Sequence, residues 1–119
     1  MAKNLDITIL LDFYGDMLTP KQREFLDYYY NEDLSLSEIA ANVGITRQGV
    51  RDAIKRAEAQ LIDFEKHLGL MERFKKINSG LDEIRELVSL IDEVNKSSLL
   101  SREINDATAR ISALTQMLR

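Results

Sequence analysis

The sequence contains no cysteine and only one histidine, His67, among its 119 residues. The absence of cysteine excludes disulfides, thiolate metal ligands and cysteine nucleophiles. A single histidine leaves no cluster for zinc and no histidine-based catalytic triad, and the chain has no glycine-rich loop to cradle a phosphate. We therefore expect a protein that is not an enzyme and that uses no metal and no cofactor.

Long apolar runs are also missing. No segment approaches the roughly 20 apolar residues that cross a bilayer, and no signal-peptide core follows the first residues of the chain. Apolar residues make up 45% and charged residues 30% of the chain, which is the balance of a globular protein rather than a disordered one. The expectation is a cytoplasmic protein without a membrane span.

Proline and glycine are scarce, with one and five residues respectively. Apolar residues recur every three or four positions, and no β-branched segment alternates with period two. This spacing predicts an all-α protein. The first expected helix runs from about Leu5 to Met17, and its spacing places Leu5, Ile9 and Phe13 on one apolar face, with Leu10 and Tyr14 beside them.

Two capping boxes mark the next helix starts. Thr19 precedes Pro20 and lies three residues before Gln22, and Ser35 lies three residues before Glu38. In each pair the hydroxyl caps a backbone N–H while the side chain at the third position caps in return, and proline favours the first helical position. We expect helices to begin directly after Thr19 and Ser35.

Residues 36–55 predict a helix-turn-helix without a wing. Gly44 permits the positive backbone angle of a tight turn, and Thr46 caps a helix that can continue to Leu68. The apolar residues that would fix the crossing of the two helices are Leu36, Ile39, Ala40, Val43, Ile45, Val50, Ala53 and Ile54. A capped short helix, a glycine turn and a second capped helix all agree with this motif. We assign residues 1–68 to this module.

Residues 69–119 form the second expected part, a helical hairpin or dimerisation tail. Apolar residues step by four and three, as in a coiled-coil seam. Residues 78–80 weaken the first helix and leave open whether it splits, and residues 95–98 predict the turn. The last helix would carry Leu100, Ile104, Ala107, Ile111, Leu114 and Leu118. The seam fits an intrachain hairpin and a homodimer interface equally well.

The outward face of the second motif helix carries the candidate binding residues. Between Ile45 and Ala57 four basic residues stand against one acidic residue, a local charge of +3. Arginine reads guanine edges and glutamine reads adenine, so Arg47, Gln48 and Arg51 would contact bases of duplex DNA. The residues expected to hold phosphates are Thr46, Lys55, Arg56, Lys21 and Arg23.

The overall charge of the chain argues against DNA binding. The chain carries 16 basic and 20 acidic residues, a net charge of −4, and no block of it is basic. Phosphate binders usually present a basic face, and a helix-turn-helix also occurs as a structural corner in proteins that never touch DNA. A purely structural motif or a protein contact thus stays open beside nucleic-acid binding.

Four segments resemble the YlxM family of small bacterial proteins. They are residues 11–14, 18–23, 35–40 and 46–56, which read LDFY, LTPKQR, SLSEIA and TRQGVRDAIKR. The resemblance covers residues 5–75 well and the remainder only as a helical tail. The family is in turn similar to the DNA-reading region four of sigma factors. Gly49 and Arg51 depart from the family's usual alanine and tyrosine, which puts its contact set in doubt here.

The resemblance implies a DNA-binding regulatory protein. Genes of this family neighbour those of the signal recognition particle, which implies a part in that pathway. The alternative is an accessory protein that does not bind DNA and docks on signal recognition particle RNA or protein. Under the first hypothesis a homodimer would supply two recognition helices, which one weakly basic module needs for useful affinity.

Overall fold

The structure, a computed structural model, describes residues 2–98 and 101–119. Throughout these residues the regular structure is helical and no strand occurs, so the predicted all-α class is confirmed. The chain divides into two compact units, Met1–Met71 and Glu72–Arg119. None of the helices described is long and apolar enough to cross a membrane.

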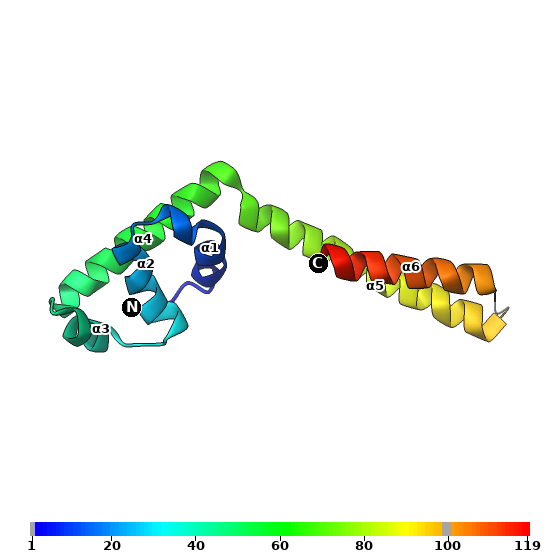
Figure 1. The fold of residues 1–119 in the computed structure, drawn as a ribbon, viewed down its shortest axis with the longest axis horizontal. Helices are drawn as coiled ribbons and strands as arrows, with labels where there is room; N and C mark the ends of the chain where they lie inside the picture. Colours follow the sequence, from blue (N-terminus) through cyan, green and yellow to red (C-terminus); the bar gives the residue numbers. More distant parts are fainter. Residues whose placement is uncertain (1, 99–100) are drawn as a thin grey trace. The chain divides into compact units, whose positions relative to one another are not determined.

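The first unit is built around one long helix. Its elements are α1 (Asp6–Tyr14), the 3-10 turn η1 (Gly15–Met17), α2 (Pro20–Leu26), the π turn η2 (Asp27–Asn31), α3 (Leu36–Val43) and α4 (Arg47–Leu68). The helices α1, α2 and α3 all pack against α4 (Figure 1). One face of α4 is therefore buried in the core, and the opposite face is exposed.

Both predicted capping boxes are confirmed. The hydroxyl of Thr19 accepts from the Gln22 backbone N–H at 3.2 Å, and the Gln22 side chain accepts from the Thr19 N–H at 3.0 Å. Ser35 and Glu38 make the same exchange at 3.1 and 3.2 Å. These local bonds set where α2 and α3 begin.

The predicted apolar side of α1 is confirmed at Leu10 and Tyr14 and wrong at Leu5 and Phe13. Leu5 is 85% exposed and Phe13 lies at the surface, whereas the buried side chains of α1 are Ile7, Leu10, Leu11 and Tyr14. Because α1 carries apolar residues on more than one side, its own spacing does not select a face. Packing against α4 selects it.

Tyr14 anchors the end of α4 to the start of the next helix, α5 (Leu70–Ser98). Its hydroxyl donates to Glu65 Oε1 at 2.7 Å and accepts from the Leu70 N–H at 3.0 Å. The same carboxylate oxygen accepts from the Met71 N–H at 2.8 Å. Burial, together with the bond to Glu65, raises the pKa of the Tyr14 hydroxyl. Tyr14 therefore stays a donor at neutral pH, and the first free N–H groups of α5 are satisfied.

The second unit is a hairpin of α5 and α6 (Arg102–Leu118), which run antiparallel (Figure 1). The Thr108 hydroxyl donates to Asp92, and Arg119 pairs with Asp82 further along. The helix α5 passes through residues 78–80 without a break.

The predicted turn at residues 95–98 is wrong, because these residues are helical. Asn95 is buried and its amide bonds the backbone of Ser101 in both directions, at 3.1 and 2.9 Å. Asn95 therefore links α5 to Ser101, the N-cap of α6, from inside the helix, while the predicted seam position Leu100 lies outside the described residues. On α6, Ala107 is exposed and Thr108 and Thr115 are buried instead.

Gly44 ends α3 in the left-handed conformation, with φ of +81°. A Cβ built there meets no atom within 4 Å, so Gly44→Ala changes only the backbone preference. We expect this variant to lose about 1 kcal/mol of unfolding free energy in thermal or urea unfolding.

The matched control is Gly80→Ala. Gly80 lies inside α5 and is equally open around its Cβ position. Alanine there should stabilise the protein by up to about 1 kcal/mol. If both variants were less stable than the wild type, this explanation of Gly44 would be contradicted.

Candidate nucleic-acid interface

The motif predicted from the sequence is present as α3, the turn at Gly44 and α4. Ile39, Val50 and Ile54 are fully buried where the two helices cross. Thr46 has extended backbone angles, and its hydroxyl accepts from the Gly49 N–H at 3.0 Å, which makes it the N-cap of α4. The inward face of α4 is thus fixed by packing, and its first turn by the cap.

The outward face of α4 carries exposed cations. Arg47, Arg51 and Lys55 are exposed, and in the described part of the chain none of them has a hydrogen bond or ion pair with another side chain. Gln48 is also exposed, but its amide donates to Asp52 Oδ1 at 3.1 Å. This i,i+4 bond places one carboxylate among the cations, and a base contact by Gln48 would have to replace it.

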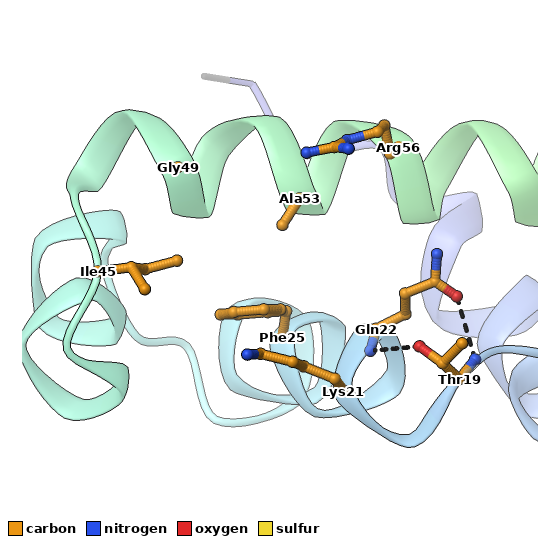
Figure 2. Close-up of a pocket in the computed structure, with 8 residues that line it drawn as sticks. All are labelled: Thr19, Lys21, Gln22, Phe25, Ile45, Gly49, Ala53 and Arg56. Carbon is orange, nitrogen blue, oxygen red and sulfur yellow. Dashed lines mark hydrogen bonds between the residues drawn. The ribbon is translucent and has the colours of Figure 1, made fainter.

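A groove of about 350 Å³ runs beside this face, between α2 and α4 (Figure 2). Phe25, Ile45 and Ala53 give it an apolar lining, and Lys21 and Arg56 reach it from opposite helices. The remaining lining residues are Thr19, Gln22 and Gly49. The structure therefore brings two of the predicted phosphate contacts, Lys21 and Arg56, to the two sides of one opening.

A side-chain hydrogen bond joins α2 to α4 near the groove. The Gln22 amide donates to Gln60 Oε1 at 2.9 Å. The sequence reasoning missed this pair because its partners lie 38 residues apart and only the packing of α2 on α4 brings them together. The capping role of Gln22 is the one signal that its side chain is held at the start of α2.

Arg23 lies apart from the other candidates. Its guanidinium pairs with Asp16 and lies 3.9 Å from an Asp27 carboxylate oxygen. Arg56 makes a weaker contact, with Nε 3.5 Å from the Asp52 backbone carbonyl. A phosphate would find Arg56 nearly free, but it would have to displace two carboxylates from Arg23.

Removing the cap of α4 is expected to loosen its first turn. Thr46→Ala deletes the acceptor of the Gly49 N–H and should cost about 1 kcal/mol of unfolding free energy. Faster amide exchange at the first residues of α4 should accompany the loss. Thr46→Ser keeps the acceptor and serves as the control, and equal stability of the alanine and serine variants would contradict a capping role.

The arrangement suits contact with a polyanion. The start of α4 presents N–H groups that are not bonded within the helix, and the helix dipole adds partial positive charge there. Exposed arginines, one exposed glutamine and the Thr46 hydroxyl surround this helix start. Such a set of donors, on a helix held from behind by a buried face, matches the way recognition helices meet a duplex.

Comparison with known proteins gives a consistent result. Residues 1–112 match the model of the UPF0122 family, described as "Putative helix-turn-helix protein, YlxM / p13 like". A UPF0122 protein of Thermoanaerobacter sp. (strain X514) is 42% identical over 110 residues, covering 92% of this chain and 94% of its own. A UPF0122 protein of Shouchella clausii is 42% identical over 106 residues, covering 81% and 97%.

Proposed function

Because the chain belongs to the UPF0122 family of YlxM/p13-like helix-turn-helix proteins, we propose that it binds duplex DNA through α4 and acts as a regulatory protein. The observation that carries this proposal is the contrast between the two faces of α4. Val50, Ile54 and Leu61 are fully buried on one face. Arg47 and Arg51 stand exposed and without an intramolecular partner on the other, within the part of the chain that is described. No folding role explains these cations.

The candidate residues divide by position. Arg47, Gln48 and Arg51 lie in the first turns of α4, the part of a recognition helix that enters the major groove, and we assign them to base edges. We assign Thr46, Lys55, Arg56 and Lys21 to phosphates, with the last two on opposite sides of the groove. Arg23 is left out of this set because carboxylates already hold its guanidinium.

The proposal includes a homodimer and a place in the cytoplasm, where a bacterial chromosome lies. One module offers a local charge of +3 on a chain of net charge −4. Phosphate contacts supply much of the affinity for DNA, so a single weakly basic helix binds poorly. Two copies on one duplex would double the number of contacts.

The second candidate function is an accessory role in the signal recognition particle pathway without DNA binding. The net negative charge of the chain favours it, because an acidic body repels a polyanion and suits a protein partner better. Here the chain would dock on the RNA or the protein of the particle.

Fluorescence anisotropy with a pool of random duplexes separates the two candidates. Each module contributes three cationic phosphate contacts, from Lys21, Lys55 and Arg56, so a bound dimer predicts a slope of roughly −5 in log affinity against log salt concentration. A parallel titration uses signal recognition particle RNA. Binding to RNA alone would support the accessory role, and no binding to duplex at low salt would overturn the DNA-binding proposal.

A further inference from the structure

The heptad seam of α5 is only half covered. Its members alternate between two sets: Leu81, Val88 and Asn95 are buried, whereas Ile77, Ile84 and Ile91 are between 42% and 48% exposed. Each set repeats every seven residues, so each forms a straight stripe along the helix. The first stripe is covered within the chain, since α6 packs there, and the second is open.

The same alternation occurs on α6. Thr108 and Thr115 are buried at a spacing of seven, and their hydroxyls bond within the chain. The large side chains, in contrast, face outward: Ile104, Ile111 and Leu118 are 42%, 38% and 64% exposed. On α6, small polar residues therefore lie at the contact with α5 and the larger aliphatic residues stay uncovered.

The two open stripes lie on one face of the hairpin. On each helix the exposed set follows the buried set by three positions. Three positions along an α-helix fall about 60° short of a full turn, so on both helices the exposed side chains are rotated by the same angle away from the contact between α5 and α6. Because α6 runs antiparallel to α5, equal rotations on the two helices point to the same side of the hairpin. Leu87 and Val94 extend this face on α5 and are 52% and 56% exposed.

We propose that this face is the dimer interface and that its occupant is the same face of a second copy, giving an antiparallel four-helix bundle. We name it the outer stripe. Its members are Ile77, Ile84, Leu87, Ile91, Val94, Ile104, Ile111 and Leu118. The inference rests on the homodimer of the proposed function, but not on its DNA contact.

The size of the outer stripe favours a second copy. Eight aliphatic side chains near half exposure present roughly 650 Å² of apolar surface, close to the ~800 Å² that each partner of a stable complex buries. Monomeric proteins seldom leave so large a contiguous apolar patch in water. In a bundle, both sets of each seam point to a common core, which accounts for the unbroken four-three spacing.

Charge places no barrier to this pairing. The segment 72–119 contains eight basic and eight acidic residues, so two copies of the hairpin carry no net repulsion. The remainder of the chain, by subtraction, holds the whole net charge of −4. Of the two units, the hairpin is therefore the better surface for self-association.

The test is the oligomeric state of the full chain in sedimentation velocity, from about 1 to about 100 µM. The wild type should sediment as a dimer at the upper concentrations. Ile84→Lys/Ile111→Lys places two charges on the outer stripe and should weaken self-association by about 100-fold or more. The matched control is Ile62→Lys, at an aliphatic side chain of α4 that is also 48% exposed but lies outside the hairpin.

Circular dichroism shows whether the lysine variant keeps its helices. If it loses them, the test uses Ile84→Ala/Ile111→Ala, because alanine favours a helix. This variant should weaken the dimer at least tenfold. A wild type that stays monomeric at 100 µM overturns the proposal. So does a dimer that survives the substitutions on the stripe, or one that Ile62→Lys breaks equally.

Duplex binding of the same variants separates this inference from the proposed function. A monomeric stripe variant should still bind DNA, with lower affinity and a shallower salt dependence, because each copy keeps its own α4. A wild type that binds DNA but stays monomeric would remove only the inference. A dimer that binds no DNA would remove only the DNA contact.

Discussion

Replacing Arg47 and Arg51 together with alanine is expected to abolish selective binding to a preferred duplex. Each arginine that reads a guanine edge contributes about 1–3 kcal/mol, so the pair should cost about 100-fold or more in affinity. Both side chains are exposed and make no intramolecular bond in the described structure, and alanine favours a helix. The unfolding free energy should therefore not fall, and anisotropy with the selected duplex measures the loss.

The matched control removes the same charge elsewhere. Arg85 and Arg110 are exposed on the hairpin, one on α5 and the other on α6. Arg85→Ala/Arg110→Ala should change the affinity little, since neither residue lies on the recognition helix. Equal losses in the two double variants would show that only overall charge matters and would contradict a reading role for Arg47 and Arg51.

Ile54→Ala is expected to lower the unfolding free energy more than Gly44→Ala or Thr46→Ala does. Ile54 is fully buried on the inward face of α4, among side chains of the first unit's core. Truncating a buried isoleucine to alanine removes apolar contact and leaves a cavity, which costs about 2–5 kcal/mol of unfolding free energy. Urea unfolding of the full chain measures it.

The neighbouring residue provides the control. Lys55 is exposed and lies on the outward face of the same helix. Lys55→Ala should leave the unfolding free energy unchanged within about 0.5 kcal/mol and weaken duplex binding modestly at all sequences. If Lys55→Ala destabilised the fold as much as Ile54→Ala, the division of α4 into a structural and a binding face would be wrong.

The parts of the fold that follow from the sequence are those determined by neighbours along the chain. Thr19, Ser35 and Thr46 cap helices because each hydroxyl finds its backbone partner three residues on. Gly44 adopts the left-handed conformation because the end of α3 requires it there. Such signals need no tertiary information, so they can be read before the fold is known.

The sequence-based predictions that are wrong concern residues whose burial or contacts are set by tertiary packing. On α1, apolar residues occur on several sides, and contact with α4 buries Leu10 and Tyr14, which the spacing places beside the apolar face, but leaves Leu5, which it places on that face, exposed. In the hairpin, Asn95 looked like a turn residue because asparagine favours turns. Its amide instead bonds the backbone of Ser101 from within the helix, a contact that spacing alone does not indicate.

The candidate site shows the same division. The helix period alone places Arg47 and Arg51 outward, because the buried residues behind them recur every three or four positions. The state of Arg23 could not be predicted in this way, since one of its partners, Asp16, lies in a different element. The groove between α2 and α4 likewise arises from the packing of two helices that are distant in sequence.

The central claim is that the outward face of α4 meets the duplex. Backbone amide spectra of the full chain, recorded while a duplex is added, test it most directly because they locate the contact residue by residue. The account predicts shifts concentrated from Thr46 to Arg56 and near Lys21, with the amides of α6 unchanged. Shifts confined to α5 and α6, or no shifts at low salt, would contradict it.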